Sequence, residues 1–509
     1  MPRGLLIFAL CLPLAVLLGF MLADPLMGSN MMVISGALFA LLIPIALAVH
    51  HRALIWTASA AINVFFLPGR PYLWMLIAGL SFLISVLSRP LTKVRSKPVW
   101  DKAVFLSVIF VAIAVIISAV NSGSIGMRVL GSATYGGRKY VGLLAGAIGF
   151  IALTMHVLPR RSAQRDCAAF ALAPITTAFS NIAYMLGPNF YFLFLVFPVE
   201  LALTQAQADM SPAIVGIKRI TGFGPTSGAI CMFCLLRWGI QGMCKLSRPW
   251  RAALFVGGIS VGLLSGSRSA AILTLLIAFA QFFAEGLHRT RYLAGLVGGL
   301  TAVFLFIAGF SESLPLPAQR TISFLPVKVD PVVASDAKVS LNWRFDMWRV
   351  VISDIPNHLW LGKGYAIDPT DLFLAEESMR RGFIHDYDIS IQAGDYHSGP
   401  LSMIVPFGVV GTIAFICFFV MSIRVLIKNL RYGDAEVRNI NVFLLSLFVG
   451  RLVLFVVFFG AIESDFWIFA SCVGLSLSVN GGVKGLAARE IIPVKQDRKT
   501  LSEVDLVTA

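Results

Sequence analysis

Long runs of apolar residues without a single charge recur along this chain, and they constrain its fold more than any other feature. Leu5–Leu22 and Ala103–Val120 are two of them. As helices, both are long enough to cross a hydrocarbon core about 30 Å thick. Within lipid every backbone amide must be paired inside its own segment, so such spans are helical. With 58 % hydrophobic and 13 % charged residues and a mean hydropathy of +0.84, the sequence predicts an all-α, polytopic integral membrane protein.

The positions of Lys and Arg orient the predicted spans, because basic residues gather in cytoplasmic loops. The basic stretches Arg89–Lys102, Arg160–Arg165, Lys245–Arg251 and Arg424–Arg438 fall on one side if the N-terminus is cytoplasmic. The net charge of +15 therefore reports topology, and no nucleic-acid partner is predicted. Leu5–Leu22 is basic at its start like a signal peptide, but another span follows at once, so we expect an uncleaved first helix.

The apolar runs and basic loops together give about 14 transmembrane helices with both termini cytoplasmic. One net crossing, together with a re-entrant or interfacial piece, is expected within 167–203, where Gly187-Pro188-Asn189 interrupts the run. The other spans are expected near 5–22, 30–49, 53–67, 71–87, 103–120, 141–158, 226–243, 252–266, 268–285, 292–310, 399–423, 439–461 and 464–482.

Five regions follow from this arrangement. They are N-terminal transmembrane helices (1–166), a central transmembrane region (167–310), a large external loop (311–398), C-terminal transmembrane helices (399–482) and a cytoplasmic tail (483–509). The loop 311–398 is rich in charged residues, and short helices are expected within it. Asn342–Ile355 is expected to place Arg344, Met347 and Val351 on one face, with Arg349 pointing elsewhere.

Four motifs with chemical potential lie on the external side of this topology. The first is "IKRITGFGPTSG" at Ile217–Gly228, and the second is "SGSRSA" around Arg268, in a tight turn between two spans. The third combines "RFDMWR" from Arg344 with "LGKGY" at Leu361–Tyr365. The fourth is "GDYHSGP", in which His397 stands where a polar turn enters an apolar helix.

These four motifs, in this order, resemble the O-antigen ligase and O-antigen polymerase superfamily over roughly Ala213–Gly411. The resemblance implies transfer of a glycan from an undecaprenyl-diphosphate carrier to a glycan or lipid-core acceptor. It places the reaction at the periplasmic face of a bacterial inner membrane. It also implies that Arg268 and Arg344 bind the diphosphate and that His397 is the catalytic histidine. Ser398 departs from the family, which often has Asn after this histidine.

The chemistry of the residues agrees with that implication. Bidentate arginines stabilise the charge that a diphosphate gains as it leaves, in place of a metal ion. A histidine with a pKa near 6.5 is suited to take the proton of the attacking hydroxyl. Lys218 and Arg219 are expected to bind phosphate or lipid headgroups. Arg349 and Arg451 complete the predicted substrate-binding set.

Several alternatives stay open at this point. Arg451 lies within a span and either meets the donor phosphate or pairs with Glu463 or Asp465. The motifs do not separate a ligase from a polymerase. A lipid-linked glycan flippase or polysaccharide exporter is the rival function, although charges within the spans are few. No cofactor and no metal site is predicted, because the spacing of His385–Asp388 and Asp395 repeats no ligand pattern. Membrane lipid and other polysaccharide-assembly proteins are the expected partners.

Overall fold

The computed structural model describes residues 19, 49–65, 67, 70–91, 98–122, 137–210, 220–365, 369–382 and 386–485. Leu54–Ala509 forms one compact unit and Met1–Ala53 another. The secondary structure of the described residues is helical, apart from a single bridge between Asn63 and Tyr72. The all-α prediction is therefore confirmed for this part of the chain.

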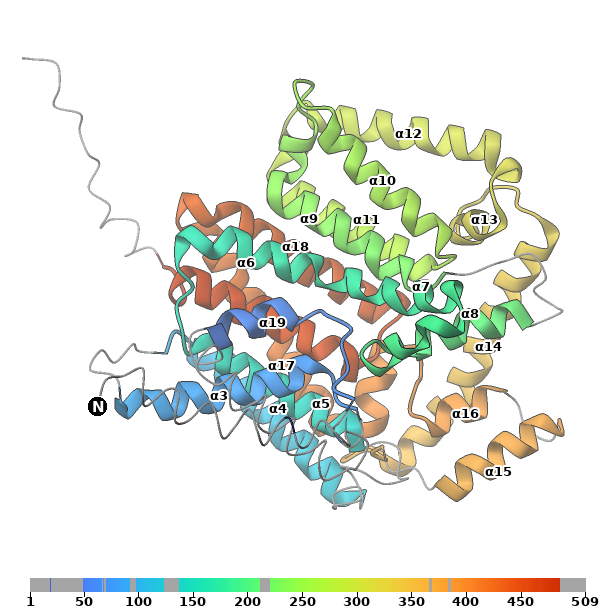
Figure 1. Cartoon of the computed structure of the whole chain (residues 1–509), viewed down its shortest axis with the longest axis horizontal. Helices are drawn as coiled ribbons and strands as arrows, with labels where there is room; N and C mark the ends of the chain where they lie inside the picture. The colour runs from blue at the N-terminus through green and yellow to red at the C-terminus, as the bar shows by residue number, and fades with distance from the viewer. Residues whose placement is uncertain are drawn as a thin grey trace, which may run out of the picture. The chain divides into compact units, whose positions relative to one another are not determined.

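The first helices of the compact unit come from the N-terminal half of the chain (Figure 1). Their bounds are α3 Leu73–Leu91, α4 Lys102–Asn121, α5 Gly137–Thr154, α6 Arg160–Leu172, α7 Ala178–Leu186, α8 Glu200–Met210 and α9 Phe223–Met243, with 3₁₀ turns η2 Ala173–Thr177 and η3 Pro188–Leu195.

The remaining helices include the segment 311–398 and the C-terminal bundle. Their bounds are α10 Trp250–Leu264, α11 Arg268–Ala284, α12 Tyr292–Phe310, α13 Leu316–Ile322, α14 Pro331–Asp354, α15 Pro369–Arg380, α16 Asp386–Gln392, α17 Gly399–Tyr432, α18 Arg438–Val453 and α19 Ile462–Asn480. Shorter turns are η5 Leu287–Arg289, η6 Ser311–Ser313, η7 Ile355–His358, η8 Ala435–Val437 and the π-helical η9 Leu454–Phe458.

Among the described residues, 6 helical stretches are long and apolar enough to cross a membrane. They are Lys102–Asn121, Arg160–Leu186, Tyr292–Ser313, Gly399–Tyr432, Ala435–Phe458 and Ile462–Asn480, and Leu73–Ser88, Trp250–Leu264 and Arg268–Ala284 are shorter apolar helices. These helices confirm a multi-pass helical membrane protein but do not support the exact total of about 14.

Particular spans differ from their predictions. All of span 5–22 except residue 19, and all of span 30–49 except residue 49, lie outside the described residues. In 53–67 the helix ends at Thr57. The candidate span that overlaps the crossing expected within 167–203 begins earlier, at Arg160, and continues through η2 to Leu186, and Gly187 after it adopts a φ of +90°. After this break η3 exposes Phe190, Tyr191 and Phe192. The interfacial position of this piece stays a prediction.

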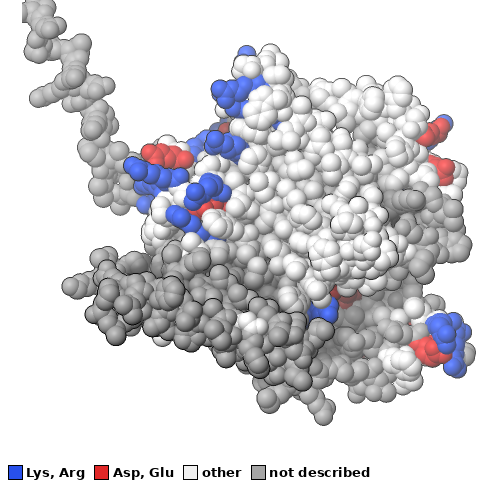
Figure 2. Space-filling model, viewed as in Figure 1, with Lys and Arg blue, Asp and Glu red and all other residues white. Residues whose placement is uncertain are grey.

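On the face shown in Figure 2, most charged side chains lie toward the left and right edges, with a broad uncharged area between them and a small charged group below it. At one end, Arg160 of α6 pairs with Asp434, and Arg424 of α17 lies 3.5 Å from Asp101, the N-cap of α4. Charges at helix ends and apolar surface between them are what a bilayer requires of a bundle.

The core is built around α17, α18 and α19, which carry a cluster of phenylalanines. Phe419 lies 5.0 Å from Phe469 and Phe418 lies 5.2 Å from Phe466, between ring centroids, and both pairs meet edge to face. This geometry is favoured by the charge distribution of aromatic rings. α4 packs on α17, and α5 packs on α19. These helices therefore form a rigid support for the segments at their ends.

The helix expected at Asn342–Ile355 is only the second half of α14. Pro331 occupies the first turn, where its missing N–H costs nothing, and the Asp330 carboxylate accepts from Val332 N at 2.8 Å. The predicted apolar face is confirmed, since Met347 and Val351 are buried together with Tyr396, Leu401 and Val405. As expected, the helix ends just before Pro356.

A kink in α17 receives the "LGKGY" motif. Pro406 removes one helical donor and Gly408 has a φ of +63°. In compensation, Lys363 N donates to Val405 O at 2.7 Å and Gly364 N donates to Pro406 O at 3.1 Å, while Val409 N donates to Leu359 O at 2.8 Å. The segment 359–365 is thus hydrogen-bonded into the helix that follows His397.

Candidate active site

The turn between α10 and α11 explains the "SGSRSA" motif locally. Gly266 adopts a φ of +62°, and the Ser267 hydroxyl caps α11 by accepting from Ala270 N at 3.4 Å. Arg268 is therefore the first residue of α11. Its Nη2 donates to Ser340 Oγ of α14 at 3.3 Å. Ser340 lies about one helical turn before Arg344.

Arg344 and His397 meet on one aromatic ring. The guanidinium carbon of Arg344 lies 5.7 Å from the centroid of Phe459, which follows η9. The His397 ring stacks on the same Phe459 at 5.3 Å, with an interplanar angle of 30°. The ring centroid of Trp343, in α14, lies 5.3 Å from that of the His397 imidazole. Two of the predicted catalytic side chains are thus brought together by α14 and by the chain after α18.

The loop that carries His397 is firmly anchored. Trp348 Nε1 donates to Tyr396 O at 2.8 Å, and Tyr396 is 3 % exposed. His397 itself has a φ of +48°, a conformation that costs free energy in a residue with a Cβ. The surrounding contacts must therefore hold it. Ser398 then serves as the N-cap residue of α17.

The electrostatics at His397 favour a neutral ring. Burial lowers the pKa of His397, the nearby Asp395 carboxylate opposes this, and the Arg344 charge lowers the pKa further. Asp395 Oδ1 lies 3.6 Å from His397 Nδ1 and accepts from His397 N at 3.4 Å. The Nδ1 atom is buried and makes no hydrogen bond. A neutral imidazole at the edge of a polar loop can accept a proton.

Arg344 is also partly withdrawn from solvent. Burial lowers its pKa, the charge of Arg320 lowers it further, and Asp395 opposes both effects. An arginine stays protonated at any physiological pH, so this site keeps a positive charge. A guanidinium that is partly withdrawn from water is suited to bind a phosphate group through paired hydrogen bonds.

Arg320 is a site residue that the sequence reasoning missed. Its Nε donates to Asp336 Oδ2 at 2.7 Å and its Nη1 donates to Gly266 O at 2.6 Å. It therefore ties α14 to the turn that carries Arg268. Phe459 was missed as well, because it lies in an apolar run, "LFVVFFG", that gives no sign of a functional ring.

A cavity of about 1140 Å³ adjoins these residues. Phe459, Ser267 and Ser269 line it on the side of the site, and Lys139, Arg451 and Glu463 add charge to its wall. Much of the remaining lining is apolar and comes from the helices, including Trp74, Phe170, Leu273, Leu447, Trp467 and Ile468. The space therefore joins a charged zone to an apolar one, which suits a lipid with a charged headgroup.

The other predicted binding residues are placed differently. Lys218 and Arg219 lie outside the described residues. The Arg349 side chain is 83 % exposed, and its Nη1 lies 3.7 Å from Asp346 Oδ1 on the same helix. Arg451 pairs with Asp465, with Nη2 2.6 Å from Oδ1. Of the two predicted partners, Arg451 therefore pairs with Asp465, because the chain reverses between α18 and α19. Contact of Arg451 with a donor phosphate stays a prediction.

The comparisons with known proteins agree with this arrangement. A family model described as O-antigen ligase matches residues 253–416, a range that contains Arg268, Arg344 and His397. No curated protein matches the chain. The family supports glycosyl transfer of the ligase or polymerase type with lipid-linked glycan substrates. The family model therefore confirms, over this range, the resemblance to the O-antigen ligase and polymerase superfamily that was inferred from the motifs.

Proposed function

We propose that the protein transfers a glycan from an undecaprenyl-diphosphate carrier to a hydroxyl of a glycan or lipid-core acceptor, at the periplasmic face of a bacterial inner membrane. The observation that carries the proposal is the shared ring of Phe459. It brings the Arg344 guanidinium and the His397 imidazole to one place, and Phe459 itself lines a cavity with both charged and apolar walls.

In the proposed reaction the acceptor oxygen attacks the anomeric carbon of the donor sugar. The bond between that carbon and the diphosphate oxygen breaks, and its electron pair remains on the diphosphate. Arg344 and Arg268 stabilise this growing negative charge. The acceptor proton passes to His397, whose lowered pKa keeps the ring neutral beforehand. The family resemblance implies that the sugar centre is inverted.

The position of the site follows from the chemical nature of the donor. Its polyprenyl chain stays in lipid while its glycan is hydrophilic, so the bond to be broken lies at the membrane surface. His397 stands directly before α17, a candidate membrane span. The apolar part of the cavity lies between helices, where a lipid chain can enter from the bilayer.

Surface glycan from a deletion strain tests the proposal. The strain is complemented with wild type, with His397→Ala or with the matched control His358→Ala, since His358 lies in the exposed turn η7. Wild type and the control should restore the glycan on a gel, and His397→Ala should not. Single repeat units in the deletion strain identify a polymerase, while polymer left on its lipid carrier identifies a ligase. Full restoration by His397→Ala would contradict the proposal and favour a flippase or exporter.

A further inference from the structure

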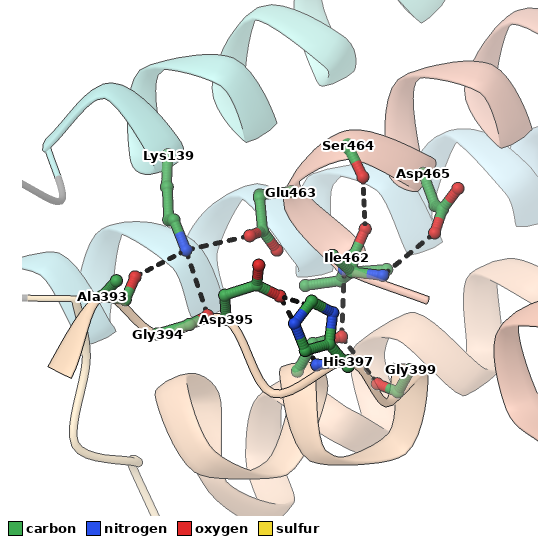
Figure 3. Close-up of polar contacts among 12 residues, drawn as sticks. Lys139, Ala393, Gly394, Asp395, His397, Gly399, Ile462, Glu463, Ser464 and Asp465 are labelled. Atoms are coloured by element: carbon green, nitrogen blue, oxygen red, sulfur yellow. Dashed lines mark hydrogen bonds and ion pairs between the residues drawn. The ribbon is translucent and has the colours of Figure 1, made fainter. Parts of the chain in front are cut away.

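Lys139, a half-buried lysine in the first turn of α5, is not among the groups given a role in the reaction above. Its Nζ donates to Ala393 O at 2.9 Å and to Gly394 O at 3.0 Å, and it lies 2.9 Å from Glu463 Oε1 (Figure 3). An ammonium group has three donors, and these three acceptors match them. The same Nζ lies 4.8 Å from the ring centroid of Tyr365, which adds a cation–π contact.

These contacts join parts of the chain that are distant in sequence. Lys139 belongs to α5 and Glu463 to α19, while Ala393 and Gly394 form the turn after α16. Gly394 has a φ of +68°, and a Cβ there would lie 2.9 Å from the Tyr365 ring. The turn therefore fits closely against the lysine and the tyrosine, and a shift of α5 or α19 would move it.

The turn leads directly to His397. Only Asp395 and Tyr396 stand between Gly394 and the histidine. Because His397 has a φ of +48°, its backbone relaxes unless contacts of the neighbouring chain restrain it. Trp348 restrains the loop at Tyr396 O, and Lys139 restrains it at Ala393 O and Gly394 O.

The ion pair itself is shielded from solvent. The side chains of Lys139 and Glu463 are 23 % and 16 % exposed, and Glu463 Oε2 is buried without a hydrogen bond. Removing the lysine alone would leave a buried carboxylate without its partner, which destabilises a protein strongly, whereas replacing both partners is often tolerated. The design of a test must take this into account.

We propose that Lys139 is a positioning residue of the transfer reaction. It fastens the Ala393–Gly394 turn to α19 and so holds His397 in the orientation that accepts the acceptor's proton. This inference rests on the proposed function of His397. Although Lys139 lines the cavity, its three donors are taken by Ala393 O, Gly394 O and Glu463 Oε1, so it acts through the backbone of the loop. Its loss should therefore slow turnover without weakening the binding of the donor.

The test uses the full-length protein in nanodiscs with the double variant K139M/E463Q, which removes both charges at nearly constant size. Lys363→Met is the matched control, because Lys363 is 53 % exposed and pairs only loosely with Asp354, at 3.5 Å. The substrate probe is the lipid extract of a deletion strain, which holds donor and acceptor, and the rate is the release of polyprenyl diphosphate. Hydrogen–deuterium exchange is measured on the same samples.

The double variant should lower kcat at least tenfold, change the donor KM less than twofold and speed amide exchange at 394–398, while α5 and α19 keep their protection. K363M should resemble wild type. An unchanged kcat, a rise in KM alone, or loss of protection throughout α5 and α19 would overturn the inference. His397→Ala is assayed in parallel: if it stays active the proposed function fails, and if it is inactive while K139M/E463Q is unaffected only the role of Lys139 fails.

Discussion

At the scale of single residues, the state of His397 decides whether the proposed chemistry can run. The imidazole must be neutral to take a proton, and burial between Trp343 and Phe459 lowers its pKa. The Asp395 carboxylate acts in the opposite direction, since it favours the charged ring. The balance between burial and Asp395 sets the pH below which transfer should fail.

Asp395→Asn tests this balance. The substitution keeps an oxygen that can accept from His397 N but removes the negative charge. Without that charge the imidazolium is less stable, so the pKa of His397 should fall further. The acid limb of the profile of kcat against pH should move to lower pH, while Glu377→Gln, on the exposed α15, should leave it in place. A limb that stays in place, or that moves to higher pH, would show that the Asp395 carboxylate does not stabilise the charged form of His397.

The arginines make a second prediction at this scale. Arg268 and Arg344 are proposed to supply the positive charge that other glycosyltransferases obtain from a metal ion. Incubation with excess EDTA, followed by assay in metal-free buffer, should leave the rate within twofold of the untreated enzyme. Arg344→Lys should lower it by about a hundredfold, because a lysine cannot bind a phosphate in the bidentate manner. Inhibition by EDTA that added Mg²⁺ reverses would refute the role given to the arginines.

At the scale of elements, the kink in α17 and the segment 359–365 behave as one unit. Both ends of the broken helix are hydrogen-bonded by "LGKGY" and its neighbours, and Tyr365 N donates to Tyr140 Oη at 2.8 Å. Ser118 Oγ of α4 donates to Pro406 O at 2.7 Å. The start of α17, and with it the His397 loop, is thus fixed to α4 and α5.

Gly408→Ala tests this coupling. Gly408 has a φ of +63°, and a Cβ would lie 2.3 Å from Trp360 O. Strain and close approach to backbone should together cost more than about 2 kcal/mol. The thermal unfolding midpoint in detergent should fall and transfer should be lost. Gly79→Ala in α3 is the control, since a Cβ there meets nothing within 4 Å. Equal unfolding midpoints for the two variants would show that the kink is not held by this segment.

The sequence predicts the elements better than it predicts their contacts. Hydropathy places a span at 292–310, and the structure has α12 at Tyr292–Phe310; the apolar face of α14 is also recovered. The contacts of Arg320, Phe459 and Lys139 escape prediction because the partners are distant in sequence, as with Lys139 and Ala393, which are 254 residues apart. Periodicity reports which face of a helix is buried, but not which helix covers it.

At the scale of the whole molecule, function depends on which side of the membrane the site faces. The basic loops predict that the segment 311–398 is periplasmic and that η8, between α17 and α18, is cytoplasmic. Arg160 pairs with Asp434 and lies 3.9 Å from Glu436, which places the basic start of α6 beside η8. These contacts are consistent with one charged end of the bundle in the cytoplasm.

Cysteine labelling in intact spheroplasts tests this orientation. Asn357→Cys in η7 and Glu436→Cys in η8 introduce thiols at exposed positions. A membrane-impermeant maleimide should label Asn357→Cys, and should label Glu436→Cys only after lysis. The wild type, whose exposed Cys244 is predicted to be cytoplasmic, is the control. The reverse pattern would place the site in the cytoplasm and exclude the proposed periplasmic reaction.

The most direct test of the central claim is to observe the transfer itself. Purified protein in nanodiscs is mixed with the lipid extract of a deletion strain, and the products are identified by mass spectrometry. Wild type should convert the lipid-linked glycan into free polyprenyl diphosphate and glycan joined to an acceptor. His397→Ala should do so at least about a hundredfold more slowly, although it reconstitutes equally well. Unconsumed donor with wild type, or equal rates for both proteins, would contradict glycosyl transfer through His397.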